Sequence, residues 1–106
     1  MANFVLLYSG GGMPASEAEQ QAVMKAWEAW FSKTGSAVVD QGDPFAPTAK
    51  TITPEGKVSD GPAGTMATGY SIIKADSLDA AVAMAKGCPV LQGGAKITVY
   101  ETVEVM

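Results

Sequence analysis

Residues 69–89 place a strand, a capped helix and a helix stop in an order that suits few small folds. Residues 69–75 are rich in residues that favour strands. Asp76 or Ser77 then offers a side-chain oxygen at the start of an apolar helical stripe. Gly87 and Pro89 end that helix, because glycine suits the C-terminal cap and proline cannot continue the helix. The segment therefore predicts a strand followed directly by a helix.

The N-terminal third repeats this order. Residues 3–8 form a short apolar run that predicts the first strand. Ser16 and Glu19 have the spacing of a capping box, in which the Ser16 oxygen accepts from the Glu19 backbone. The helical pattern continues to Lys33, and Gly35 stands where a C-terminal cap belongs. The apolar side chains of this helix fall on one broad stripe, which predicts the face that packs on the core: Val23, Met24, Trp27, Trp30 and Phe31.

The remaining segments complete the fold prediction. Residues 36–41 and 96–103 predict two further strands, and residues 50–53 and 57–59 flank the turn at 54–56 as a hairpin. The order is strand, helix, strand, hairpin, strand, helix, strand. We therefore predict a ferredoxin-like α+β fold, βαββαβ with an inserted β-hairpin, in which two helices cover one face of an antiparallel sheet. The 106 residues suit one domain, 1–106.

Composition excludes several classes of function. The chain has no histidine and one cysteine, which argues against a zinc site and removes the usual general base near neutral pH. Its basic residues are all lysines and its net charge is −4, so we expect no nucleic-acid binding. We also expect no metal or organic cofactor.

The sequence also bears on where the protein works. No stretch reaches the roughly 20 apolar residues of a membrane span. A single cysteine makes no internal disulfide, which favours a reducing, cytoplasmic setting.

The first strand predicts a partner for the sheet. Phe4, Leu6 and Tyr8 lie on one side of it, and Val5 and Leu7 lie on the other, so both faces carry apolar side chains. Two helices on one face leave the second face open. A second copy of the chain is the simplest cover, and we expect a homodimer.

Together these segments resemble the YCII-related family, in the branch named after an Asp-Gly-Pro-Phe motif. The resemblance rests on five segments that span nearly the whole chain: Phe4–Tyr8, Asp60-Gly61-Pro62, Gly69–Ala81, Cys88-Pro89 and Ile97–Glu101. It implies a dimeric α+β barrel, in which two ferredoxin-like sheets face each other. Clefts in the wider superfamily hold small molecules, and several of its members are enzymes.

The chain departs from the family pattern at two points. Some members are proposed to use a His–Asp pair as acid and base, and this chain has no histidine. Ala63 stands where the family has the phenylalanine of its motif, which implies a more open or differently shaped pocket.

Asp60 is the first candidate for a catalytic residue. A carboxylate at the rigid Gly61-Pro62 turn could act as acid and base or bind a ligand, and Gly61 and Pro62 are candidate ligand-binding residues with it. The alternative is that its oxygens accept hydrogen bonds from the amides of the turn. Asp43 is a second candidate ligand-binding carboxylate, with an ordinary turn residue as its alternative. Tyr70, and then Tyr8, are candidate ligand-binding phenols, which otherwise bridge the sheet to an interface.

The sequence supports two alternative hypotheses for the function of this protein. The first is a small-molecule-binding protein or cofactor-independent enzyme, which would carry out proton transfer or isomerisation on a small metabolite in a cleft near Asp60, with Tyr70 as an orienting donor. The alternative is a non-catalytic homodimeric interaction module. The resemblance implies a link of that module to transcriptional regulation, because relatives in this branch tend to occur near alternative sigma factors. Cys88 is expected to be a buried structural thiol.

Overall fold

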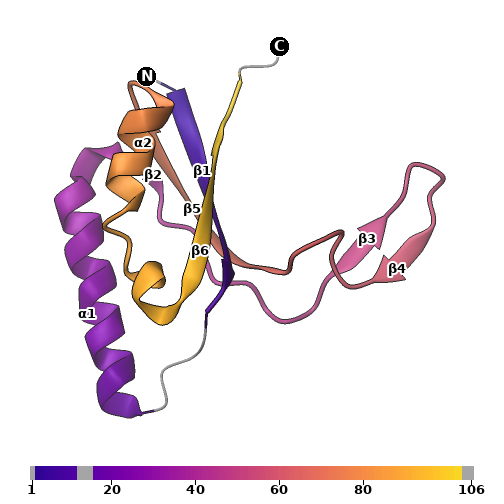
Figure 1. Ribbon diagram of the computed structural model, residues 1–106, viewed down its shortest axis with the longest axis horizontal. Helices are drawn as coiled ribbons and strands as arrows, with labels where there is room; N and C mark the ends of the chain where they lie inside the picture. Colours follow the sequence, from indigo (N-terminus) through magenta and orange to yellow (C-terminus); the bar gives the residue numbers. More distant parts are fainter. Residues whose placement is uncertain (1, 12–15, 104–106) are drawn as a thin grey trace.

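The computed structural model describes residues 2–11 and 16–103 and forms two layers with a projecting hairpin (Figure 1). The elements in chain order are β1 (Ala2–Gly10), α1 (Glu17–Thr34), the 3₁₀ helix η1 (Gly35–Ala37), β2 (Val38–Asp40), β3 (Lys50–Ile52), β4 (Val58–Asp60), β5 (Ala67–Ala75), α2 (Leu78–Ala85), the 3₁₀ helix η2 (Pro89–Gly93) and β6 (Ala95–Glu101). Both α-helices cover the same face of the main sheet.

The main sheet has the strand order β2-β5-β1-β6, and each of its strand pairs is antiparallel. This is the ferredoxin-like arrangement, with β3 and β4 as an inserted two-stranded antiparallel hairpin. The predicted fold class is therefore confirmed. The sheet is open, with β2 and β6 at its edges. A barrel would need the sheet of a second copy, and both the barrel and the homodimer stay predictions.

The helix ends follow local sequence signals. The Ser16 hydroxyl oxygen accepts from the Glu19 N–H at 3.1 Å, and Ser77, rather than Asp76, caps α2 by accepting from the Ala80 N–H at 3.1 Å. Gly35 ends α1 with a φ of 58°, a backbone conformation that glycine adopts without a Cβ penalty. The hydrogen bonds made by Ser16 and Ser77 satisfy amides that a helix start otherwise leaves unpaired.

The core lies between the helices and the sheet. Phe4, Leu6 and Ile73 are fully buried on the helix-facing side of β1 and β5. Trp30 joins them from α1, and its indole N–H donates to the Met84 carbonyl at 3.1 Å, which ties α1 to the end of α2. The opposite face of the sheet carries side chains that are only partly buried, among them Val5, Leu7 and Ile72.

Three expectations differ in detail. The strand predicted for 36–41 begins only at Val38, because Gly35–Ala37 forms a 3₁₀ turn, and the last strand ends at Glu101, leaving Val103 77% exposed. Val23 and Met24 lie on the apolar side of α1 but are exposed, because the N-terminal half of α1 extends past the end of the sheet (Figure 1).

Among the described residues, none of the helices is long and apolar enough to cross a membrane.

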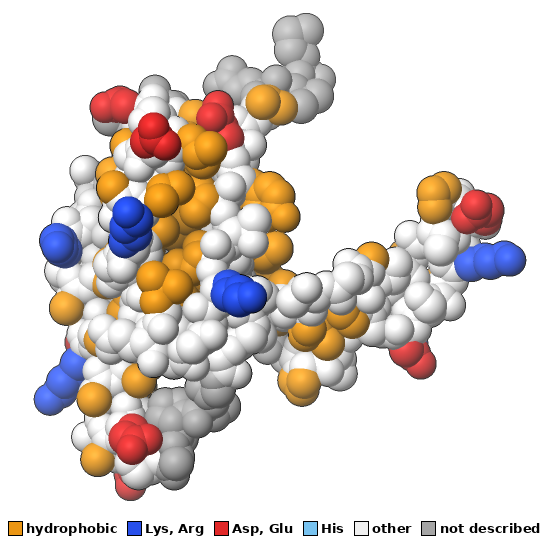
Figure 2. Space-filling model, viewed as in Figure 1, with side chains coloured by type: hydrophobic (Ala, Val, Ile, Leu, Met, Phe, Trp, Pro, Cys, Tyr) orange, Lys and Arg blue, Asp and Glu red, His pale blue; other side chains and the backbone are white. Residues whose placement is uncertain are grey.

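The hairpin leaves the body of the molecule as an arm, residues 46–66, which stands clear of the sheet (Figure 1). The radius of gyration is 15.3 Å, whereas a compact domain of this length has a value of about 13 Å. Ile52 and Val58 on the arm are 71% and 59% exposed. Figure 2 shows hydrophobic side chains along the side of the sheet that faces the arm. The molecule thus presents an open angle between two partly apolar surfaces.

Candidate functional site

A cleft of about 820 Å³ opens between α1 and the sheet. Its walls come from α1, from the ends of β1 and β5, from the segment after β2 and from η2. The lining residues are Tyr8, Met24, Trp27, Glu28, Phe31, Ser32, Gln41, Gly42, Asp43, Pro44, Thr68, Gly69, Tyr70, Ser71 and Val90. The volume lies in the range of small-molecule sites in proteins.

Aromatic rings form one wall of the cleft. Trp27 and Phe31 lie one turn apart on α1, with ring centroids 5.5 Å apart. The Trp27 ring also meets the Tyr8 ring from β1 edge-on, at 5.7 Å and an interplanar angle of 63°. Such pairs hold their rings in fixed relative orientations. The wall is therefore formed before any ligand arrives.

A chain of hydrogen bonds closes the floor. The Tyr8 hydroxyl donates to Ser71 Oγ at 2.7 Å, and the Ser71 hydroxyl donates to the Gln41 carbonyl at 2.8 Å. The Cys88 thiol donates to the Tyr8 hydroxyl at 3.7 Å. Ser71 is fully buried and both of its bonds are made, so the chain fastens the segment after β2 to the sheet.

Burial keeps the Tyr8 hydroxyl and the Cys88 thiol protonated. Desolvation raises the pKa of Tyr8, and the hydrogen bond to Ser71 offsets only part of that effect. Burial also raises the pKa of the Cys88 thiol. Both groups therefore stay protonated at neutral pH. Tyr8 is a donor rather than a base, and Cys88 is a buried thiol rather than an activated nucleophile, as expected.

Two glycines allow the segment after β2 to run against β5. Gly42 has a φ of 76°, and a Cβ there would overlap the carbonyl oxygen of Tyr70. At Gly69 a Cβ would lie 3.2 Å from the Asp43 carbonyl oxygen and 3.4 Å from the Tyr8 ring. The Asp40 carboxylate accepts from the Gly42 N–H at 2.8 Å and fixes the turn. The close backbone approach builds the wall that carries Asp43.

Carboxylates supply the charge of the cleft. Glu28 lies on α1 beside Trp27, and Asp43 lies on the facing segment. Both residues are exposed, and neither carboxylate group makes a hydrogen bond or ion pair with the rest of the described chain. None of the seven lysines lines the cleft. The formal charge of the cleft is therefore negative.

Tyr70 borders the cleft, but its phenol is already engaged. It donates to Asp40 Oδ2 at 3.2 Å, and its ring stacks on Phe45 with centroids 5.8 Å apart. The charge of Asp40, and then the hydrogen bond to it, raise the pKa of Tyr70. Strand alternation puts Tyr70 on the open face of the sheet, with Ile72. Neither Tyr8 nor Tyr70 thus has its O–H proton free for a ligand.

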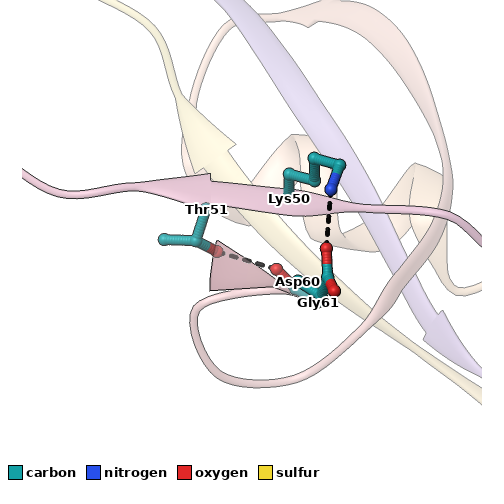
Figure 3. Close-up of polar contacts among 4 residues, drawn as sticks. All are labelled: Lys50, Thr51, Asp60 and Gly61. Carbon is teal, nitrogen blue, oxygen red and sulfur yellow. Dashed lines mark hydrogen bonds and ion pairs between the residues drawn. The ribbon is translucent and has the colours of Figure 1, made fainter. Parts of the chain in front are cut away.

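Asp60, Gly61 and Pro62 lie on the arm, outside this cleft. The Asp60 side chain is 91% exposed and accepts from Lys50 Nζ at 2.6 Å, rather than from amides of the turn (Figure 3). The turn is held instead at Gly61, whose N–H donates to the Ala49 carbonyl and whose carbonyl accepts from the Thr51 hydroxyl at 2.9 Å.

Asp60 and Gly61 border a second hollow of about 580 Å³ at the base of the arm, and Pro62 lines neither space. The structure therefore brings Tyr8, Asp43 and Tyr70 together and leaves the Asp-Gly-Pro turn apart from them. Among the described residues, no group of three or more His, Cys, Asp or Glu side chains is placed to hold a metal ion.

Sequence reasoning missed Trp27, Ser71 and Gly42. Trp27 lies on the apolar stripe of α1, where core packing is the usual explanation. Ser71 gives no signal of its own, because its role depends on Tyr8, 63 residues away. Gly42 directly precedes the candidate Asp43, and a glycine at a turn is a signal for a positive φ or a close backbone approach.

Comparison with known proteins supports the fold. The chain is similar to 5-chloro-2-hydroxyhydroquinone dehydrochlorinase (TftG) from Burkholderia phenoliruptrix AC1100, whose structure was solved in complex with 2,5-dihydroxybenzoquinone. The TM-score is 0.58 at 17% identity, and the match covers 97% of this chain and 95% of that one. No protein-family model and no curated protein matches the chain. The likeness shows a shared α+β fold.

Proposed function

We propose that this protein binds a small planar molecule in the cleft between α1 and the sheet. The observation that carries the proposal is the preformed aromatic wall of Tyr8, Trp27 and Phe31, beside a floor whose polar groups are already paired. Protein sites for small molecules are concave and mostly apolar, with a few fixed polar groups. This cleft meets each of those conditions.

The structural neighbour supports the size class of the ligand. TftG binds 2,5-dihydroxybenzoquinone, a single six-membered ring, on the same fold. We carry over only the class, a small flat ring, because fold does not fix function. The motifs quoted above, together with this fold, also lead us to propose membership of the YCII-related family. The free, buried Cys88 is consistent with the cytoplasmic setting that we propose.

A catalytic role would fall on a carboxylate. Tyr8 and Cys88 are held protonated, so neither serves as a base. Asp43 lines the cleft and could exchange a proton with a bound molecule in an isomerisation. Asp60 as acid and base stays a separate proposal, in which the ligand would occupy the second hollow, at the base of the arm.

The alternative function, a non-catalytic interaction module, is favoured by the arm. Its exposed Ile52 and Val58 suit a protein contact better than a ligand site. We propose that a second copy of the chain makes this contact. The arm then supports the homodimer, and the cleft remains the site for the small molecule.

NMR spectroscopy of the ¹⁵N-labelled protein tests the proposal with a set of one- and two-ring aromatic compounds. We expect saturable shifts of the Trp27 indole N–H and of the Gly42, Gly69 and Ser71 amides. Ser32→Phe places a ring at the cleft and should weaken binding at least about tenfold, by excluding the ligand from an apolar site. Ala29→Phe, also on α1 and exposed but outside the cleft, is the control. Shifts confined to other regions, or equal binding by both variants, would overturn the proposal.

A further inference from the structure

We infer that the cleft selects a flat ring that carries a positively charged amino group. This inference rests on the proposed function, since it names the class of ligand for the same site. Three features carry it: the partly buried Trp27 ring in the lining of the cleft, the unpaired carboxylates of Glu28 and Asp43, and the absence of lysine from the lining.

We expect the ring of the ligand to pack against Trp27 on α1. Trp27 is only partly buried, although Tyr8, Trp30 and Phe31 all contact its ring. It is also one of the residues that line the cleft. A flat ring stacked there would bury apolar area, and tryptophan also offers the most favourable ring face for a cation.

The amino group belongs beside the two carboxylates. Glu28 lines the cleft from α1 and Asp43 lines it from the facing segment, so negative charge lies on two walls of the cleft. A cation there gains attraction from both groups without a competing lysine. An anion would face the same two charges with no compensating donor cation, which disfavours carboxylate and phosphate ligands.

The donors and acceptors of the floor sharpen the selection. The protons of Tyr8 and Ser71 are given to Ser71 and Gln41, so they are not available to a carboxylate or phosphate of the ligand. Ser32, Gln41 and Thr68 also line the cleft and carry neutral donors, so the charged groups that remain for a ligand are the acceptors of Glu28 and Asp43. An ammonium group carries donors only and matches these two carboxylates.

Three probes with the same phenol ring test the inference. Tyramine ends in an ammonium group, 4-ethylphenol is neutral, and 3-(4-hydroxyphenyl)propanoate ends in a carboxylate. Dissociation constants are measured by calorimetry at pH 7, and the site is verified by the Trp27 indole N–H shift. We expect tyramine to bind more tightly than 4-ethylphenol, and at least about tenfold more tightly than the propanoate, with the gap shrinking as salt is added.

Matched variants assign the selection to the two carboxylates. Asp43→Asn and Glu28→Gln should each weaken tyramine about two- to fivefold, as expected for exposed ion pairs, and leave 4-ethylphenol within about twofold. Glu55→Gln at the tip of the arm removes the same charge outside the cleft and should change neither probe.

The outcomes separate this inference from the proposed function. If 4-ethylphenol shifts Trp27 saturably and tyramine binds no more tightly, the cleft is a ligand site but the selection for an amine is wrong. The same conclusion follows if Glu55→Gln weakens tyramine as much as Asp43→Asn does. If none of the three probes shifts Trp27, the proposed function itself fails, and the inference fails with it.

Discussion

At the scale of single residues, Tyr8 belongs both to the hydrophobic core and to the lining of the cleft, and its hydroxyl donates a hydrogen bond to Ser71. Tyr8→Phe keeps the ring but leaves Ser71 without its donor, which should cost about 1–2 kcal/mol of unfolding free energy at pH 7. The raised pKa of Tyr8 means that the folded state holds this proton more tightly than the unfolded chain does. Its contribution is complete below about pH 10 and is lost as pH rises further, by about 1.4 kcal/mol per pH unit.

Urea unfolding of the parent and Tyr8→Phe between pH 7 and pH 11 measures both effects. The difference in stability between them should shrink above about pH 10, because only the parent has this phenol to ionise on unfolding. Tyr100→Phe, on β6 and 54% exposed, is the control for removal of a phenol. A constant difference across the whole range would show that the Tyr8 hydroxyl is solvated in the folded protein.

Gly42 allows a matched pair of substitutions. Gly42→Ala meets both a positive φ and the Tyr70 carbonyl oxygen, whereas Gly56→Ala on the arm has a similar φ of 84° and open space. We expect Gly56→Ala to cost about 1 kcal/mol, from backbone strain alone. Gly42→Ala should cost at least about 2 kcal/mol and also displace the wall of the cleft, with loss of ligand binding. Equal costs in thermal and urea unfolding would contradict this account of the wall.

At the scale of elements, local signals predicted the helices and strands, while the cleft depended on arrangement in space. Ser16, Gly35 and Ser77 cap the helices where expected, because capping needs only neighbours in sequence. The stripe of α1 also predicted which face is apolar. It could not show that Trp27 borders a cleft, because that depends on how far α1 extends past the sheet and where the segment after β2 returns.

The Asp-Gly-Pro turn illustrates the same limit. The sequence predicted its hairpin correctly, and singled out Asp60 on the premise of a rigid turn that opens onto a cavity. Whether a turn lies over the body or projects from it is set by tertiary contacts, which a short motif does not encode. In this fold the turn projects, and its carboxylate is exposed.

Asp60→Asn tests this placement on the arm. The ion pair with Lys50 is exposed on both sides, at 68% and 91%, and such pairs contribute little to stability. We expect the unfolding free energy to change by less than about 0.5 kcal/mol in urea. Thr51→Val, which removes the hydroxyl that donates to the Gly61 carbonyl, should cost more, about 1 kcal/mol. A loss above about 1.5 kcal/mol for Asp60→Asn would mean that an assembled protein buries the carboxylate.

At the scale of the whole molecule, the arm is the feature that a single chain does not explain. An isolated two-stranded hairpin is at best marginally stable in water, and this one contributes nothing to the hydrophobic core. The open face of the sheet carries Val5, Leu7 and Ile72 without a covering layer. Both surfaces border the same angle (Figure 2). A second copy seated in that angle would cover both at once, and two-fold symmetry would repeat the contact.

Replacement of residues 47–66 by Asn-Gly tests whether the arm holds the dimer. The Phe45 N–H donates to the Thr68 carbonyl at 2.8 Å, so the ends of the arm already lie side by side and a tight turn can join them. Because the arm lies outside the core, the shortened chain should keep its helices, its sheet and binding at the cleft. Sedimentation at micromolar concentration should show a dimer for the full chain and mostly monomer for the shortened one.

Point substitutions on the arm provide a matched test. Ile52→Ser with Val58→Ser should also weaken the dimer, while Lys57→Ser, on the same hairpin, should not. A full chain that sediments as a monomer would refute the dimer, and a shortened chain that still dimerises would place the contact on the sheet alone.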